Sequence, residues 1–166
     1  EFKKFKNFAI AKHSQRAIDF HLNSNFPKEN FSEIYTRYSK ALLGIGGAEG
    51  SDKANDLELE LIALQNPYTD DMSSGIEILT LYQGRPQAFT TLNVFERSNA
   101  DLRVNSYVVK SDEKGIAKVK VENDNAYLID NVILRPANDK LLKDKGVIWE
   151  SLWAALTFGV IRANGL

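Results

Sequence analysis

Residues 127–136, YLIDNVILRP, form the apolar run that constrains the fold most strongly. A short and nearly continuous apolar run is typical of a strand that is buried on both faces, near the centre of a sheet. Asp130 and Asn131 stand inside this run, although strand interiors disfavour both residue types. The run therefore predicts a central strand with a carboxylate that is either satisfied by neighbouring donors or kept for proton transfer.

The segments before this run share a twofold alternation of apolar and polar residues, which is typical of strands. Turn-like separators such as QGRP and SDEKG divide them. Because short connections favour antiparallel neighbours, we predict an antiparallel meander of about five strands over residues 75–135. Its expected strands are residues 76–82, 87–95, 102–110, 116–122 and 126–134.

The segment after the apolar run has a helical period instead. Within residues 147–163 a wide apolar stripe recurs at helical spacing, which predicts a closing amphipathic helix packed on the sheet. The stripe consists of Trp149, Leu152, Trp153, Leu156 and Val160.

The first 70 residues are predicted to be mainly helical. Three phenylalanines spaced three apart, Phe2, Phe5 and Phe8, fit one helix face, although residues 7–11 fit a short strand equally well. A second helix is expected over residues 14–22. Asn30 and Glu33 form a capping-box pattern at the start of a helix that Gly44 ends.

A further helix is expected from residue 52 to residue 64, although residues 57–61 alternate and so also fit a strand. Together, the segments predict one α+β domain over residues 1–166. It has N-terminal helices, an antiparallel meander sheet and a C-terminal amphipathic helix packed on that sheet.

Composition limits the possible functions. The chain has no cysteine, which excludes disulfides, thiolate catalysis and cysteine metal sites, and indicates a reducing, cytoplasmic location. The net charge of -1 argues against a nucleic-acid partner, and no apolar run is long enough for a membrane span. The only histidines, His13 and His21, are too far apart to share a metal, so none is predicted.

A basic loop precedes the expected closing helix. Lys140, Lys143 and Lys145 lead into Gly146, and a glycine at a helix N-terminus exposes backbone N–H groups at the positive end of the helix dipole. This arrangement is a generic site for phosphate or pyrophosphate. In the alternative interpretation, the glycine serves only the turn and the lysines are solvated.

The order of strand, proline, basic loop, glycine and amphipathic helix resembles the acyl-CoA segment of GNAT-type N-acyltransferases. The resemblance covers NVILRPANDKLLKDKGVIWESLWAALTFGVIRANG, and the hairpin ILTLYQGRPQAFTTLNVF is similar to that family's second and third strands. Residues 30–165 follow the family's order of elements.

The resemblance implies acyl-CoA as cofactor and transfer of an acyl group to an amine acceptor. Asp130 would be the base that deprotonates the amine. Val132 and Leu134 would offer backbone groups to the pantetheine arm. The pyrophosphate loop would consist of Lys143, Lys145, Gly146, Val147 and Ile148.

Two alternatives stand beside the enzyme hypothesis. The scarcity of histidine, the absence of cysteine and the branched Ile148 in the loop favour a non-catalytic interaction protein, such as a subunit, an inhibitor or an adaptor. The basic N-terminal segment with its interleaved phenylalanines could instead bind nucleic acid or an acidic partner. Oligomeric state is not predicted.

Overall fold

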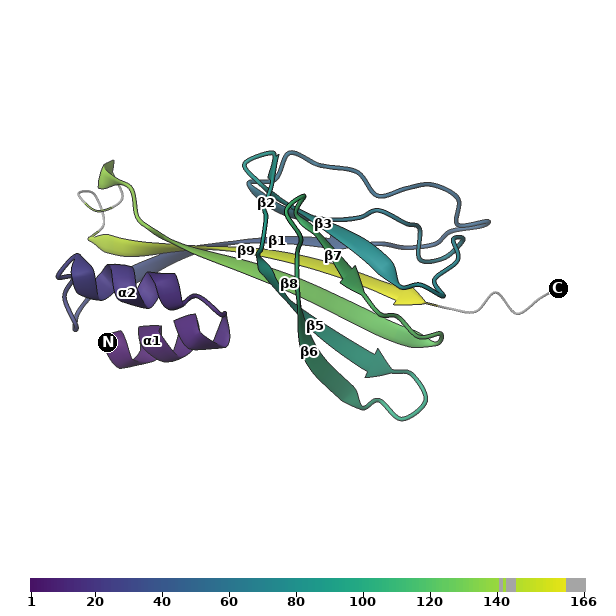
Figure 1. Ribbon diagram of the computed structural model, residues 1–166, viewed down its shortest axis with the longest axis horizontal. Coiled ribbons are helices and arrows are strands. Elements are labelled where there is room, and N and C mark those ends of the chain that lie inside the picture. The colour runs from purple at the N-terminus through teal and green to yellow at the C-terminus, as the bar shows by residue number, and fades with distance from the viewer. Residues whose placement is uncertain (141, 143–145, 161–166) are drawn as a thin grey trace. The chain divides into compact units, whose positions relative to one another are not determined.

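The computed structural model describes residues 1–140, 142 and 146–160 (Figure 1). The chain forms two compact units, each built from two stretches of sequence. Unit 1 comprises residues 1–37 and 132–153, and unit 2 comprises residues 38–131 together with residues from 154 onwards. Each unit is therefore described by itself.

Two helices precede all the strands, and the strands then follow one another to residue 160. The helices are α1 (Phe2–Ala11) and α2 (Gln15–Asn23). The strands are β1 (Ser32–Ala41), β2 (Leu59–Ala63), β3 (Ile76–Tyr82), β4 (Arg85–Pro86), β5 (Thr91–Ser98), β6 (Val104–Lys110), β7 (Ile116–Val119), β8 (Asn125–Pro136) and β9 (Val147–Val160).

The strands belong to two sheets. One sheet has the order β1-β9-β8-β5-β6, and the other has the order β2-β3-β4, with β7 also paired to β3. The strands β1, β8 and β9 run through both units. No helix among the described residues is long and apolar enough to cross a membrane.

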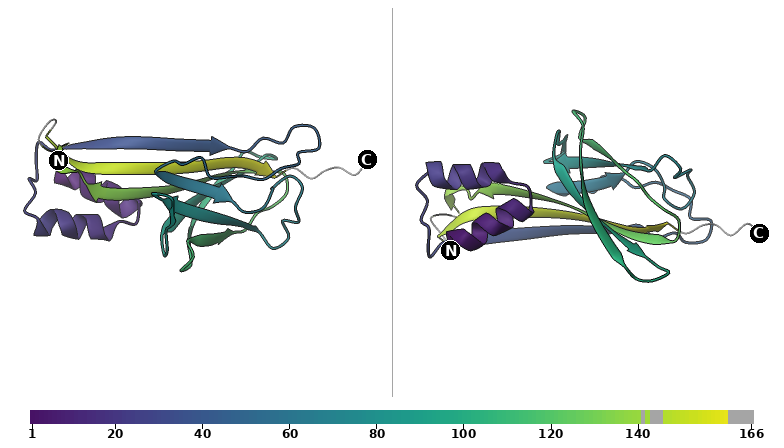
Figure 2. Two further views of the ribbon diagram at one scale, coloured as in Figure 1. Left: turned by 90° about the horizontal axis from the view of Figure 1, so that it is seen from above. Right: turned by 60° about the horizontal axis from the view of Figure 1, so that its bottom comes forward.

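Unit 1 is a helix-on-strand arrangement. The helices α1 and α2 lie on one side of its strand segments (Figure 2). Its core joins Phe5 and Ala17 from the helices to Ile148 and Trp149 from β9. Because phenylalanine and tryptophan bury large apolar areas, these rings supply most of the hydrophobic stabilisation of this small core.

Unit 2 contains the larger hydrophobic core, to which both sheets contribute. Its inward residues alternate along the strands with more exposed ones, as in β3, where Ile76 and Ile78 are fully buried. Tyr127 on β8 stacks on Phe158 of β9 with ring centroids 5.4 Å apart. Further buried members are Leu59, Leu61, Leu92, Val94, Ala117, Val119, Ile129 and Leu156.

The predicted closing helix is wrong, because residues 147–160 of that segment form strand β9. Nine of the fourteen residues of β9 are buried, and over residues 147–152 the buried ones lie on both faces of the strand, so the apolar residues there do not alternate with polar ones. A strand that is covered on both faces is hydrophobic throughout, and such a run also fits a helical stripe. Residues 161–163 of the predicted helix lie outside the described residues.

The rest of the predicted architecture also needs correction. The expected helix that begins at Asn30 is strand β1, and the segment 52–64 ends in strand β2, so the first 70 residues are not mainly helical. Strands do lie at the five expected places, but β3 and β7 belong to one sheet while β5, β6 and β8 belong to the other. The expected α+β fold with a single meander is therefore wrong, and the described chain is mostly β.

Candidate functional site

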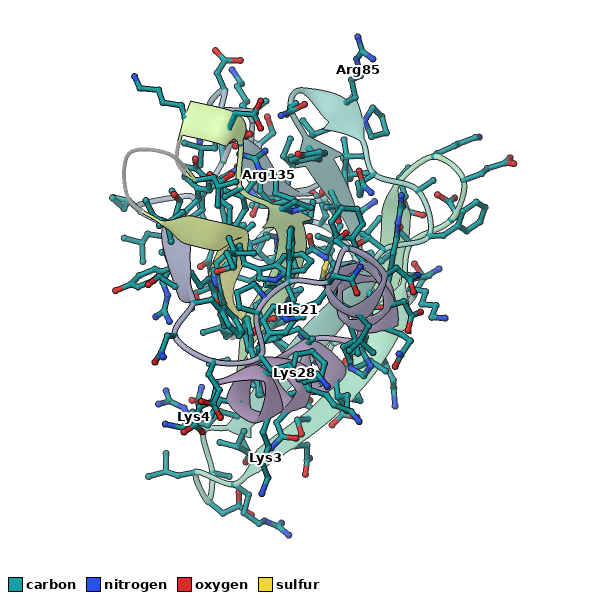
Figure 3. All side chains as sticks on the ribbon, turned by 90° about the vertical axis from the view of Figure 1, so that its left-hand side faces the viewer. Lys3, Lys4, His21, Lys28, Arg85 and Arg135 are labelled. Atoms are coloured by element: carbon teal, nitrogen blue, oxygen red, sulfur yellow. The ribbon has the colours of Figure 1, made fainter. Side chains whose placement is uncertain are left out.

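Helix α1 separates its phenylalanines from its lysines. Phe5 is buried and Phe8 is half-buried, whereas Lys3 and Lys4 are exposed. Figure 3 shows Lys3, Lys4 and Lys28 beside the two helices. The phenylalanine spacing seen in the sequence therefore marks the inward face of a helix, and the basic residues form its solvent face.

His21 on α2, labelled in Figure 3, is fully buried. Two hydrogen bonds hold its ring. The indole N–H of Trp149 donates to Nδ1 of His21 at 3.0 Å. Because a carbonyl oxygen can only accept, Nε2 of His21 carries its hydrogen and donates to the backbone oxygen of Pro27 at 3.1 Å. His21 is thus a neutral imidazole of one defined tautomer.

The surroundings of His21 lower its pKa. Its ring lies within 4.7 to 5.3 Å, centroid to centroid, of Phe2, Phe31 and Phe5. Burial among these rings disfavours the charged form and lowers the pKa below its usual value of 6.5, against the smaller opposing effect of the bond to Pro27. A proton on Nδ1 would also face the Trp149 N–H, which cannot accept it.

This geometry predicts an acid-sensitive fold. In the unfolded chain this histidine binds a proton below about pH 6.5, whereas in the folded protein its lowered pKa keeps it neutral. The contribution of His21 to the free energy of unfolding is therefore fully present above pH 6.5 and is lost as the pH drops towards the lowered pKa. Below pH 6.5 the free energy of unfolding should decrease as the pH falls, by at most about 1.4 kcal/mol per pH unit for this one proton. Urea denaturation between neutral pH and pH 5 measures this slope.

The control for this prediction is the second histidine. His13 is exposed, so His13→Gln should keep the wild-type slope, whereas His21→Phe should flatten it. Equal slopes for wild type and His21→Phe would show that His21 does not cause the acid sensitivity.

The surface of unit 1 carries a cluster of aromatic and basic side chains around Trp153 of β9. Phe8 of α1 stacks on the Trp153 ring with centroids 5.6 Å apart and planes inclined by 17°. The Lys12 ammonium lies 4.7 Å, and the Arg37 guanidinium 4.8 Å, from the centroid of the same ring. The Arg37 guanidinium is also 5.4 Å from the centroid of Tyr35. We call these five residues the Trp153 patch.

Polar contacts beside the patch fix the orientation of the indole. The Trp153 N–H donates to Oγ of Ser151 at 3.1 Å. The Ser151 hydroxyl in turn donates to the carboxylate of Glu33 on β1. Trp153 is therefore held by stacking, by two cations and by a hydrogen-bond chain, while part of its surface stays accessible.

The patch has the composition of a protein-binding surface. Tyr35 is 65% exposed and Arg37 is exposed, and both extend outward from the alternating strand β1. Tryptophan, tyrosine and arginine are the residues most enriched at energetically important interface positions. Residues 1–37 also carry seven lysines and arginines against four acids. The arrangement is thus suited to an acidic protein surface.

Unit 2 contains a buried ion cluster around Lys40 of β1. The Lys40 ammonium is 2.7 Å from Asp52 and 3.1 Å from Glu60, and the side chains of the three residues are 11%, 5% and 1% exposed. The ammonium also donates to the backbone oxygens of Lys53 and Leu61. Lys40 thereby attaches the irregular segment around residue 53 to strand β2.

The predicted catalytic residue, Asp130, lies on β8 in unit 2. It is 9% exposed and accepts a hydrogen bond from the side-chain amide of Asn93 at 2.7 Å. Its neighbour Asn131 donates to Thr90 at 2.8 Å and to the Thr91 backbone at 2.9 Å. Both polar residues of the apolar run therefore have partners in β5 or in the residue that immediately precedes it.

The predicted pyrophosphate loop lacks the helix that it requires. Gly146 has a φ of +62°, and its N–H donates to the Leu142 backbone, but the next element is strand β9. Val147 and Ile148 are buried in β9, while Val132 is buried and Leu134 half-buried in β8. Lys143 and Lys145 lie outside the described residues. Gly146 therefore does not stand at the N-terminus of a closing helix.

The described residues contain no group of three or more His, Asp or Glu side chains that could hold a metal ion.

The Trp153 patch was not predicted from the sequence. One available signal was the sequence of residues 32–41, SEIYTRYSKA, in which a twofold period puts Tyr35, Arg37 and Ser39 on one face, as expected of a strand with one solvated face.

Comparison with known proteins gives one match. No curated protein and no solved structure matches the chain. A family described as a domain of unknown function, DUF4198, matches residues 2–133, which include both helices and the strands β1 to β7. The chain therefore belongs to the DUF4198 family.

Proposed function

We propose that this protein is a non-catalytic interaction protein that binds an acidic segment of a partner protein through the Trp153 patch. The observation that carries the proposal is the position of the Arg37 guanidinium, 4.8 Å from the Trp153 centroid and 5.4 Å from the Tyr35 centroid. Such stacking holds the cation at the surface in one orientation, so a carboxylate can bind it with little loss of side-chain entropy.

The same contacts favour a protein over a nucleic acid as partner. Proteins that bind single strands need aromatic faces on which bases can stack. The Trp153 ring is already stacked by Phe8 and covered by the cations of Lys12 and Arg37. The accessible groups are ring edges, aliphatic stems and charges, which match the mixed apolar and acidic surface of a protein.

The acyl-CoA-dependent acyltransferase stays a prediction from the sequence. It relied on the dipole end of a helix after Gly146, and strand β9 occupies that place. Titration calorimetry with acetyl-CoA tests it independently of the interaction proposal.

We expect an acidic peptide of glutamate, leucine and tyrosine to bind the protein, and Arg37→Glu to weaken this binding at least about tenfold, as expected for an interface hot spot. Fluorescence anisotropy of the labelled peptide measures the affinity. A peptide of the same length with lysine in place of glutamate should not bind, because the patch carries two cations.

A charge-matched variant makes the test specific. Lys118 is exposed on β7 in unit 2, so Lys118→Glu changes the net charge as Arg37→Glu does without altering the patch. This control should keep the wild-type affinity. Equal losses of affinity in both variants would show that binding depends on net charge alone. Tighter binding of single-stranded DNA than of the acidic peptide would show that the partner is a nucleic acid.

A further inference from the structure

Strand β6 is an edge strand with an unusually apolar exposed side. It pairs with β5, and among the described residues no strand pairs with its other edge. Val104 is 60% and Val108 is 49% exposed. Proteins commonly protect such edges with proline, charges or bulges, but residues 104–109, VNSYVV, contain neither proline nor charge.

The register shows which backbone groups of β6 point to the open edge. At one end of the ladder the Ser111 N–H donates to the Thr90 oxygen, and at the other the Ser98 N–H donates to the Arg103 oxygen. Because hydrogen-bonded pairs alternate in an antiparallel ladder, the odd-numbered residues of β6 bond to β5. The N–H and C=O groups of Val104, Ser106 and Val108 therefore point away from β5.

We propose that β6 pairs with β6 of a second copy of this chain, antiparallel and with the twofold axis at Ser106. This register pairs the residues with outward-pointing backbone groups with one another: Ser106 lies opposite Ser106, and Val104 lies opposite Val108 in both directions. The central residues would then exchange about six backbone hydrogen bonds, and the two sheets would join into one.

The sequence around this axis favours a second copy over an unrelated strand. The segment VNSYV has valine at both ends, so each exposed valine meets an exposed valine of the other copy. Cross-strand pairs of branched residues stabilise sheets. The flanking cations do not oppose each other, because Arg103 faces Val109 and Lys110 faces Leu102 in this register.

An engineered cysteine tests the register directly. In a hydrogen-bonded antiparallel pair the Cα atoms are about 5.5 Å apart, a separation that a disulfide can bridge. The chain has no cysteine of its own, so the only protein thiol with which Ser106→Cys can pair is the equivalent one of another copy, formed when it displaces glutathione from a mixed disulfide. With oxidised glutathione as oxidant, we expect Ser106→Cys to run as a covalent dimer on a non-reducing gel.

Two further variants complete the test. Ser74→Cys carries an exposed cysteine away from β6 and should stay mainly monomeric. Val108→Pro removes an outward N–H that β5 does not use, so the fold should persist while the dimer is lost in analytical ultracentrifugation. If circular dichroism shows that Val108→Pro is unfolded, the double variant Val104→Lys, Val108→Lys takes its place. This double variant should also sediment as a monomer in analytical ultracentrifugation.

Either of two results would overturn the proposal. One is a wild-type protein that sediments as a monomer at its highest soluble concentration. The other is cross-linking of Ser106→Cys that is no faster than that of Ser74→Cys.

Discussion

Lys40→Met is expected to lower the free energy of unfolding by about 3–5 kcal/mol. The ammonium of Lys40 is the cation that the structure places between Asp52 and Glu60, whose side chains are 5% and 1% exposed. Its removal leaves two buried carboxylates in unit 2 without their shared cation, although each still accepts a backbone hydrogen bond, Asp52 from Ala63 and Glu60 from Asn55. Urea denaturation at neutral pH measures the loss.

The loss of stability is expected to be large only for an ion pair that is buried. The pair between Lys120 and Glu122 has side chains 84% and 60% exposed, so Lys120→Met should cost less than about 1 kcal/mol. In Lys40→Met, trypsin should also cleave faster after Lys53, because the Lys53 backbone oxygen loses its bond to Lys40. Equal losses for the two variants would contradict the role of Lys40 as a buried clamp.

Trp149→Ala is expected to lower the stability of unit 1 by about 3–5 kcal/mol. The Trp149 ring is 1% exposed, stacks 4.8 Å from Phe5 and donates its N–H to His21. The substitution therefore creates a cavity and leaves Nδ1 of His21 without its donor. Hydrogen exchange should accelerate at the amides of α1 and α2, which pack on this ring.

The second tryptophan is the matched control. Trp153 is only half-buried, so Trp153→Ala should cost about 1 kcal/mol and leave the exchange of α2 nearly unchanged. If both substitutions accelerate exchange in α2 to the same degree, the ring of Trp149 does not organise the core of unit 1.

Helix α2 and the strands at the five expected places could be predicted because their local signals were strong. The helix expected at 14–22 is confirmed as α2, and the strand expected at 76–82 has the bounds of β3. In β3 the buried Ile76, Ile78 and Thr80 alternate with more exposed residues, which is the pattern of a strand with one covered face. The local sequence pattern was enough to predict an element where one of its faces is buried throughout and the other is more exposed throughout.

Prediction failed where both faces of a strand are covered or where a polar residue points inward. In β9 the aromatic and aliphatic residues fill both faces, so a stripe at helical spacing could be found among them. In β1 the inward residues include Thr36 and Lys40, and a lysine at a buried position hid the alternation. The partners of Lys40 are carboxylates from a distant segment, which no local pattern shows.

The Trp153 patch depended on strand order. Tyr35 and Arg37 come from β1 and Trp153 comes from β9, and these strands are neighbours in the sheet although they lie at opposite ends of the chain. Because the sequence predicted a helix at both places, the three residues could not be combined into one surface. Asp130 was noticed for its unusual place in a strand, but its bond to Asn93 required the register of β5 with β8.

The two tryptophan indole signals in a ¹H–¹⁵N NMR spectrum test the interaction surface most directly. During titration with the acidic peptide, the Trp153 signal should shift progressively, whereas the buried Trp149 signal, bonded to His21, should stay in place. In the Arg37→Glu variant, the Trp153 signal should stay unchanged during the same titration. A Trp153 signal that stays unchanged in wild type, or that shifts equally in Arg37→Glu, would contradict binding at the Trp153 patch.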